Sequence, residues 1–205
     1  MRFRPAIIVV AAGSGSRFGG PLHKLAQPFE DLTVLGATLR QAIRSQLPVV
    51  VVTNHTLAPI ARAQMAQRDV VVLSDADAAR GMGFSIATGV AERSGAPGWL
   101  VLPGDMPLVQ SGTLLAVATA LEQNPVVYAQ HKGRRGHPVG FAAELYSELV
   151  LLTGDDGARR VVARYPAFGQ EVPDVGVLTD VDTPADLVAL RESLAQSTAA
   201  SPARR

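Results

Sequence analysis

The sequence contains no cysteine, which excludes disulfides, thiolate zinc sites, iron–sulfur clusters and a cysteine nucleophile. It also has little net charge, because 19 Lys and Arg residues stand against 18 Asp and Glu residues. Nucleic acids are bound through strongly positive surfaces, so we expect no nucleic-acid partner. The four histidines, His23, His55, His131 and His137, are too widely spaced for a helix-borne zinc pair.

A long apolar run is also missing. The apolar stretch 6–12 has only seven residues, whereas about 20 are needed to cross a bilayer. It runs directly into Gly and Ser without a cleavage region, which favours a buried strand over a signal peptide. We therefore expect a cytoplasmic protein with no membrane association.

The length of 205 residues and the apolar content of 47% favour one globular domain, which we place at residues 1–192. Residues 193–205 are rich in Ala, Ser and Arg and lack periodicity, so we expect a disordered tail there.

Short apolar runs alternate with helix-like segments along the first part of the chain. The runs lack polar alternation, which is typical of strands that are covered on both faces in a parallel sheet. This order predicts an α/β fold with a doubly wound, mostly parallel, Rossmann-like sheet. The predicted strands are 6–11, 49–53, 70–73 and 99–103, and the predicted helices are 34–46, 57–67, 84–93 and 110–123.

The second part of the chain is less regular. Residues 126–130 and 138–141 are predicted strands on either side of a loop at 132–137, which indicates a small antiparallel insertion. Further helices are predicted at 142–151, 156–165 and 184–195.

The sharpest motif is the glycine-rich segment 10–24, VAAGSGSRFGGPLHK, which follows the first predicted strand. Glycines allow backbone N–H groups to approach phosphate oxygens, and Arg17 and Lys24 can neutralise their charge. The spacing differs from that of a P-loop and from that of the dinucleotide fingerprint. An ordinary glycine-rich turn with two solvated cations is the alternative.

A second motif, LVLPGDMP at 100–107, places Asp105 just beyond the end of a predicted strand. Ligands of open α/β sheets bind outside the carboxyl ends of the strands, where Asp105 would face the glycine-rich segment. Mg²⁺ takes carboxylate and phosphate oxygens together, so Asp105 is a candidate ligand. The alternative is a simple turn that Asp105 caps.

These motifs resemble those of the nucleotidyltransferases that attach a nucleotide to the molybdenum cofactor. The family signature is LAAGxxSRxG followed shortly by Lys, although the segment between Arg17 and Lys24 is one residue longer here. The resemblance implies a nucleotidyltransferase fold of the glycosyltransferase-A-like type, with Asp105 holding the catalytic Mg²⁺ and with Arg17 and Lys24 also catalytic. The nucleotide-binding residues that it implies in this segment are Ala11, Ala12, Gly13, Ser14, Gly15, Ser16, Arg17 and Lys24.

Two further segments gain a role from the resemblance. The segment 179–187, TDVDTPADL, is similar to one that supplies a second metal ligand in related enzymes, which implies Asp182 and, with less support, Asp180. Residues before Pro184 also suit the N-cap of the last helix, and Asp186 is interpreted as a surface or capping carboxylate. The segment 79–86 is similar to a base-and-ribose contact, which implies Gly81, Met82 and Ser85. The alternative is a helix entry with Met82 and Phe84 in the core.

Two segments resemble the cytidylyltransferase branch of the family, namely 134–141 (RRGHPVGF) and 153–159 (TGDDGAR). The first, with Lys132 just before it, offers Arg134, Arg135 and His137 to the phosphate and pterin of an acceptor, unless it is only a solvated hairpin tip. The second has no assignable chemistry, and its aspartates suit a helix cap.

The reaction that we expect is Mg²⁺-dependent transfer of CMP from CTP to the phosphate of molybdopterin, with release of pyrophosphate. GTP as donor and a sugar phosphate as acceptor stay open, although the chain after residue 140 is short for a sugar pocket. A non-catalytic chaperone that delivers the cofactor to a molybdoenzyme is the alternative from another class.

Overall fold

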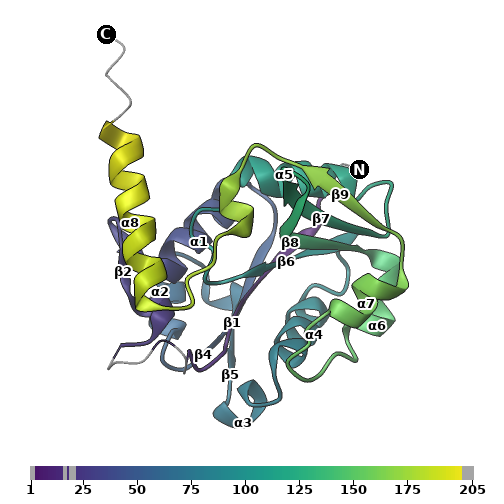
Figure 1. The fold of residues 1–205 in the computed structure, drawn as a ribbon. Helices are drawn as coiled ribbons and strands as arrows, with labels where there is room; N and C mark the ends of the chain where they lie inside the picture. The colour runs from purple at the N-terminus through teal and green to yellow at the C-terminus, as the bar shows by residue number, and fades with distance from the viewer. Residues whose placement is uncertain (1–2, 16–17, 19–21, 200–205) are drawn as a thin grey trace.

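The computed structural model describes residues 3–15, 18 and 22–199, with side chains up to Glu192. Its strands (Figure 1) are β1 (Ala6–Ala11), β2 (Pro28–Phe29), β3 (Leu32–Thr33), β4 (Val49–Asn54), β5 (Val70–Leu73), β6 (Gly98–Pro103), β7 (Val126–His131), β8 (Arg134–Ala142) and β9 (Ala167–Glu171). Its α-helices are α1 (Val34–Arg44), α2 (Ala58–Arg62), α3 (Asp75–Ala78), α4 (Met82–Glu92), α5 (Ser111–Ala120), α6 (Tyr146–Leu149), α7 (Arg159–Arg164) and α8 (Pro184–Ala199). Its 3₁₀ turns are η1 (Lys24–Ala26), η2 (Gln67–Asp69), η3 (Ala143–Leu145) and η4 (Val175–Leu178).

The main sheet has seven strands in the order β5-β4-β1-β6-β8-β7-β9. Strands β5, β4, β1 and β6 run parallel to one another. Strand β8 is antiparallel to both of its neighbours, and β9 is parallel to β7. Strands β2 and β3 form a separate antiparallel pair. The predicted α/β fold, with a mostly parallel sheet and an antiparallel insertion, is therefore confirmed.

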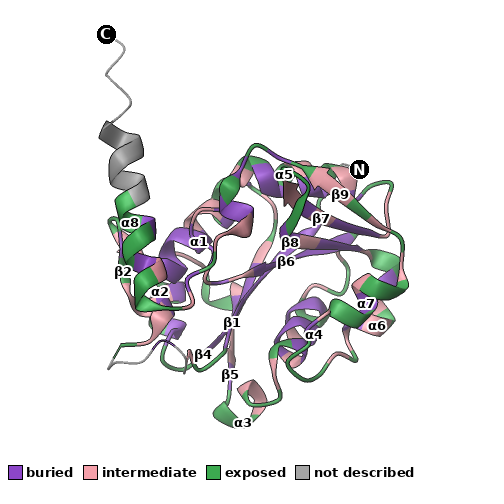
Figure 2. Cartoon of the chain, in the orientation of Figure 1, coloured by how far each residue is buried: buried purple, intermediate pink, exposed green. Residues whose placement is uncertain are grey.

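Alternation along the strands divides the core into two layers. Ile7 and Val9 of β1 face a cluster to which α1, α2, α5 and α8 contribute, whereas Ile8 and Val10 face a cluster built with α4, α6 and α7. The buried strands therefore lie between two helical layers (Figures 1 and 2). A strand that is covered on both faces needs apolar residues throughout, which explains the continuous runs in the sequence.

The parallel strands agree with the predicted ones to within one residue, and the second half of the chain departs more. The helix predicted at 142–151 is the turn η3 followed by the short α6, and α7 starts three residues after the predicted start at 156. Strand β9 was not predicted, because its sequence AFGQE has no apolar run. Its pairing with β7 determines its conformation.

The prediction of a loop over residues 132–137 is wrong, because the turn there is shorter. Lys132 and Gly133 alone form a two-residue turn, with φ of 50° and 74°. Positive φ at both central residues is what a tight hairpin requires. Strand β8 therefore starts at Arg134, so Arg134, Arg135 and His137 lie on a strand and not on a loop tip.

The last helix also exceeds its predicted end, since the backbone of α8 is helical to Ala199. Residues 193–199 were expected in a disordered tail, but Ala, Leu and Gln are good helix formers and α8 continues through them. Residues 200–205 lie outside the described residues. Within the described ranges, no helix is long and apolar enough to cross a membrane.

Candidate functional site

The glycine-rich segment follows β1 at the carboxyl end of the parallel strands. Ala11 and Ala12 are buried, whereas Gly13 and Ser14 are exposed to an open cavity. A Cβ at Gly13 would meet no protein atom within 4 Å, so a side chain there would project into open space. The predicted residues Ser16 and Arg17 lie outside the described residues.

Lys24 lies at the start of η1, and its ammonium bridges two carboxylates. Its Nζ is 2.8 Å from Asp105 Oδ2 and 2.8 Å from Asp182 Oδ1. Burial lowers the pKa of Lys24, but the charges and hydrogen bonds of Asp105 and Asp182 outweigh burial, and the net pKa is raised above 10.5. Lys24 is therefore a cation at neutral pH.

Asp105 is positioned by the turn that ends β6. The Gly104 N–H donates to the Val10 carbonyl at 2.9 Å, and the Thr38 hydroxyl donates to the Gly104 carbonyl at 3.0 Å. A Cβ at Gly104 would lie 3.0 Å from that of Ala11, which is tighter than most Cβ contacts, so the absence of a side chain favours this approach to the end of β1. The turn thus places Asp105 beside the glycine-rich segment.

The segment 174–182 brings two more carboxylates to Asp105. A Cβ at Gly176 would lie 2.5 Å from the Leu108 backbone, and one at Gly136 would lie 2.1 Å from the Val177 carbonyl oxygen, so the chain passes closely between these residues. The Val181 N–H then donates to the Asp105 carbonyl at 3.0 Å. Because Val181 is buried, its neighbours Asp180 and Asp182 turn toward the site.

The cap of α8 is formed by the residue after Asp182. Thr183 Oγ1 accepts from the Asp186 N–H at 3.2 Å, so Thr183 is the capping residue. In return, Asp186 Oδ2 accepts from the N–H groups of Asp182 and Thr183, at 3.1 and 2.7 Å. The prediction of a capping role for Asp186 is confirmed.

One oxygen each of Asp105, Asp180 and Asp182 lies within 4.8 Å of the others. Lys24 offsets one of these three negative charges. Asp105 Oδ1 is buried and has no hydrogen-bond partner among the described residues, and such an atom is costly unless a ligand satisfies it. Carboxylate oxygens are the ligands that Mg²⁺ and Mn²⁺ prefer, so these residues fit a divalent cation.

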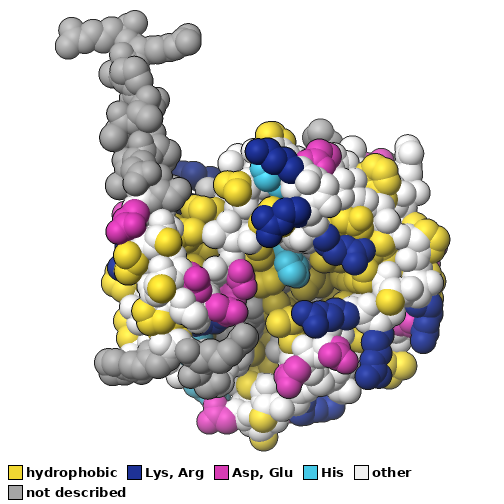
Figure 3. Space-filling view, viewed as in Figure 1, with side chains coloured by type: hydrophobic (Ala, Val, Ile, Leu, Met, Phe, Trp, Pro, Cys, Tyr) yellow, Lys and Arg dark blue, Asp and Glu magenta, His cyan; other side chains and the backbone are white. Residues whose placement is uncertain are grey.

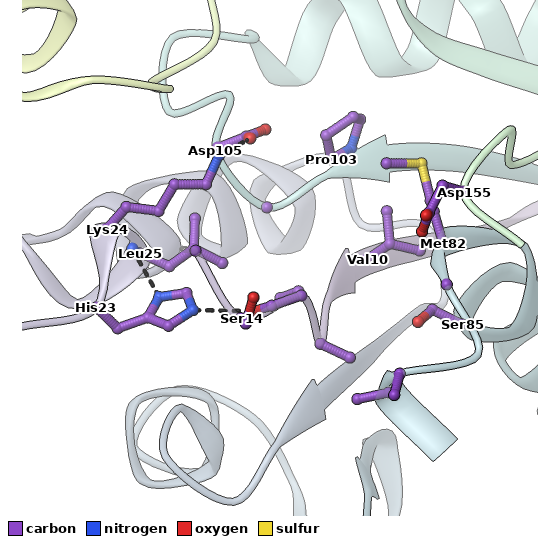
Figure 4. A pocket seen from close by; sticks show the side chains of 18 residues that line it. Val10, Ser14, His23, Lys24, Leu25, Met82, Ser85, Pro103, Asp105 and Asp155 are labelled. Carbon is purple, nitrogen blue, oxygen red and sulfur yellow. Dashed lines mark hydrogen bonds and ion pairs between the residues drawn. The ribbon is translucent and has the colours of Figure 1, made fainter. Parts of the chain in front are cut away.

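A cavity of about 610 Å³ opens beside this cluster (Figure 4). It is lined by the glycine-rich segment, by His23 and Lys24, by the residues before and within the first turn of α4, and by Asp105 and Asp155. The predicted residues Ala11, Ala12, Gly13, Ser14, Gly15, Lys24, Gly81, Met82, Ser85 and Asp105 all line it.

The first turn of α4 closes one end of this cavity. Ser85 is only 4% exposed, and its hydroxyl faces the cavity (Figure 4). Met82 is 48% exposed and lines the cavity, so the alternative that placed it in the core is wrong, whereas Phe84 is partly buried against the core. Gly81 has φ of 91°, and a Cβ there would lie 2.4 Å from Gly154.

A second cavity, of about 820 Å³, is also lined by Asp105. The predicted residues Arg134, Arg135 and His137 line it, and the Arg135 guanidinium stacks on the Tyr128 ring at 3.9 Å. Figure 3 shows basic side chains along the β8 and α7 side of the hollow and acidic ones toward the start of α8. The two cavities share Met82, Pro103, Asp105 and Asp155.

His137 in the second cavity is uncharged near neutral pH. Burial lowers its pKa below 6.5, the charges of Asp105 and Asp180 oppose this shift, and Arg159 adds to it. His137 can therefore donate or accept a hydrogen bond, but it does not add to the positive charge of this wall.

The segment 153–159 lies at the site, which its sequence motif alone did not predict. Gly154 accepts from the Gly83 N–H and donates to the Arg80 carbonyl, both at 2.8 Å, so the segment is fixed to the start of α4. Asp155 lines both cavities, and Arg159 lines the second. The cap of α7 is Ala158, without a side-chain bond, so the aspartates do not cap it.

Comparison with known proteins agrees with this geometry. Residues 7–170 match the MobA-like NTP transferase domain. The purine catabolism protein PucB of Bacillus subtilis (strain 168) is 29% identical over 202 residues, covering 91% of this chain and 96% of that protein. The molybdenum cofactor cytidylyltransferase of Escherichia coli (strain K12) is 22% identical over 185 residues, covering 90% and 94%.

Solved structures are similar over the same length. Rv0371c from Mycobacterium tuberculosis H37Rv superposes with a TM-score of 0.78 at 30% identity, covering 92% of this chain and 98% of that one. Rv0371c has also been solved in complex with manganese, and that structure superposes with a TM-score of 0.76. Because the family match spans most of the chain, this protein belongs to the MobA-like NTP transferase domain family.

Proposed function

We propose that this protein is a Mg²⁺-dependent cytidylyltransferase that transfers CMP from CTP to the phosphate of a molybdopterin-type cofactor. The observation that carries the proposal is that two cavities meet at Asp105, where Asp180, Asp182 and Lys24 also converge. A reaction between two bound substrates requires such a junction, because the reacting atoms must be held about 3 Å apart.

The first cavity suits the nucleoside triphosphate. Backbone N–H groups of Gly13, Ser14 and Gly15 face the phosphates, together with Lys24 and, by resemblance, Ser16 and Arg17. The base and ribose lie at the start of α4, where the Ser85 hydroxyl is directed into the cavity. These residues hold the α-phosphorus at the junction and neutralise its charge.

The carboxylates of Asp105 and Asp182, with Asp180 beside them, would hold the divalent cation. When bound, the cation supplies positive charge to phosphate oxygens and orients the triphosphate. The buried Asp105 Oδ1 supports this assignment, and the manganese complex of Rv0371c supports a divalent cation in the proposed reaction. Mg²⁺ is proposed because it pairs carboxylates with nucleotide phosphates.

The second cavity suits the acceptor. Arg134, Arg135 and Arg159 attract its phosphate, and the neutral His137 can bond to the phosphate or to the pterin. A terminal phosphate is already an anion at neutral pH, so the reaction needs no general base. An acceptor oxygen bonds to the α-phosphorus, and the bond from that phosphorus to the β-phosphate oxygen breaks, with its electron pair leaving on pyrophosphate.

The match to the cytidylyltransferase of E. coli and the segments 134–141 and 153–159 favour CTP and this acceptor. The test is to mix the protein with Mg²⁺, the cofactor and each of the four nucleoside triphosphates, and to measure pyrophosphate. We expect CTP to give the fastest release, and CTP with Mg²⁺ to raise the melting temperature more than GTP does.

Two variants sharpen the test. Asp105→Asn keeps the shape of the side chain but removes its charge, and we expect it to abolish pyrophosphate release. Asp31→Asn removes a highly exposed carboxylate that lines neither cavity, and it should react like wild type. If GTP is the one nucleotide that gives pyrophosphate, the donor is GTP and not CTP. No release with any donor, despite binding of the cofactor, would favour a carrier of the cofactor instead.

A further inference from the structure

His23 lines the cavity proposed for the nucleotide and directly precedes Lys24. Its imidazole contacts the backbone of Gly13, ten residues before it, and of Leu25, two residues after it (Figure 4). Nδ1 accepts from the Leu25 N–H at 3.1 Å, and Nε2 lies 2.9 Å from the Gly13 carbonyl oxygen. The ring therefore joins Gly13 to η1, the turn that presents Lys24.

The two contacts define the protonation of the ring. Because Nδ1 accepts from a backbone N–H, it carries no proton, and the proton of the neutral ring is on Nε2. Nε2 then donates to the Gly13 carbonyl. Both ring nitrogens of His23 are thus occupied, which leaves no lone pair for a metal ion or for proton abstraction.

The bond to Gly13 has a consequence for phosphate binding. In a trans peptide the C=O and the following N–H point in opposite directions. Fixing the Gly13 carbonyl on His23 therefore directs the Ser14 N–H away from His23. In the proposed function, this N–H is one of the donors to the phosphates of the nucleotide.

Gly15 shows that the ring is closely packed against this segment. Gly15 has φ of 65°, and a Cβ there would lie 3.0 Å from His23 Nε2. A side chain at position 15 would displace the ring. The positive φ and the absent side chain thus allow the imidazole to reach Gly13.

We propose that His23 is a positioning residue for the triphosphate: it holds the Gly13–Ser14 peptide and Lys24 in one fixed geometry. This inference rests on the proposed function, because it concerns how that function's nucleotide is gripped. His23 acts through Ser14 and Lys24 and does not itself touch the reacting atoms. Positioning of this kind lowers the entropy that the loop loses on binding.

Two substitutions separate the two contacts. The amide nitrogen of Gln lies as many bonds from Cβ as Nε2 does, so His23→Gln can donate to the Gly13 carbonyl. The amide oxygen of Asn lies as many bonds from Cβ as Nδ1 does, so His23→Asn can accept from the Leu25 N–H and cannot reach Gly13. His23→Ala loses both contacts.

The experiment measures the affinities for CTP and for CMP, each with Mg²⁺, for wild type and the three variants. We expect CTP affinity to fall about tenfold in His23→Ala and His23→Asn, the size of one lost hydrogen bond. His23→Gln should stay within about threefold of wild type. CMP affinity should change less than about twofold throughout, because CMP lacks the β- and γ-phosphates, whereas a merely structural loss would lower both affinities.

His131→Ala is the matched control. The Nδ1 atom of His131 also lies at hydrogen-bond distance from a backbone carbonyl, that of Val172 at 2.9 Å, and the residue lines neither cavity. It should bind CTP like wild type. Wild-type CTP affinity in His23→Ala, or rescue by Asn and not by Gln, would overturn this inference alone. A wild-type protein that binds no nucleoside triphosphate would overturn the proposed function and this inference together.

Discussion

The ammonium of Lys24 and a divalent cation would compete for the same carboxylate oxygens. Lys24 bonds to Asp105 Oδ2 and Asp182 Oδ1, which belong to the three residues that fit the cation. Before both oxygens can bind the cation, Lys24 must leave them. We therefore expect Lys24→Met, which keeps the length of the side chain but not its charge, to bind Mn²⁺ more tightly than wild type.

The magnitude follows from the two ion pairs. A hydrogen bond between charged groups contributes about 1.5–3 kcal/mol. The Lys24 and Asp105 side chains are 14% and 18% exposed, but that of Asp182 is 34% exposed, and its pair is worth much less in solvent. A combined value of about 2 kcal/mol predicts a roughly thirtyfold gain in Mn²⁺ affinity.

The assay is calorimetric titration of Mn²⁺ into wild type, Lys24→Met and Arg44→Met, without nucleotide. Arg44 is an exposed cation in the last turn of α1, so this control removes equal charge outside both cavities. With CTP present, Lys24 can pair with phosphates instead, and the advantage of Lys24→Met should shrink or reverse. Without Mn²⁺, this variant should melt about 4–8 °C lower, and Mn²⁺ should restore it.

Equal or weaker Mn²⁺ binding by Lys24→Met would refute the competition. So would a gain of the same size in Arg44→Met, because it would reflect net charge and not the bridging contacts. Lys24→Gln serves as a second variant, since its amide can still bond to one carboxylate. It should fall between wild type and Lys24→Met.

Three further predictions concern positions around the site. Asp186→Ala removes the acceptor for two N–H groups before α8; it should lower the free energy of unfolding by about 1 kcal/mol and weaken Mn²⁺ binding, as urea denaturation and calorimetry would record. Gly15→Ala should cost about 1–2 kcal/mol in urea denaturation because of its positive φ, whereas Gly13→Ala, with open space around its Cβ, should leave stability unchanged but weaken CTP binding. Burial lowers the pKa of His137 below 6.5, so the unfolded chain binds a proton that the folded chain does not, and the free energy of unfolding should fall as the pH falls below 6.5. His137→Gln should flatten this dependence, and an unchanged slope would contradict it.

Much of the fold could be predicted because its signals are local. Continuous apolar runs mark strands that are covered on both faces, and the four parallel strands lie within one residue of the prediction. Strand β9 could not be predicted, because its conformation comes from pairing with β7 and not from its own residues. The turn at Lys132 was missed for a similar reason, since Lys rarely adopts a positive φ.

The site divides along the same line. The glycine-rich segment and Asp105 are recognisable because each follows a strand directly, so the chain itself directs them to one edge of the sheet. Asp182 is 158 residues from Lys24 in the sequence, and no local pattern predicts that the two side chains meet. The close passage of segment 174–182 between Leu108 and Gly136 determines it.

By itself, then, the sequence determined the α/β class, the parallel strands, the family and the residue types available at the site. Tertiary structure alone decided how closely the oxygens of Asp105, Asp180 and Asp182 approach one another, that burial lowers the pKa of His137, and that His23 joins Gly13 to the turn of Lys24. The physical reason is that periodicity and turn chemistry act over a few residues. The distances, burial and charge of a site arise only when distant segments pack together.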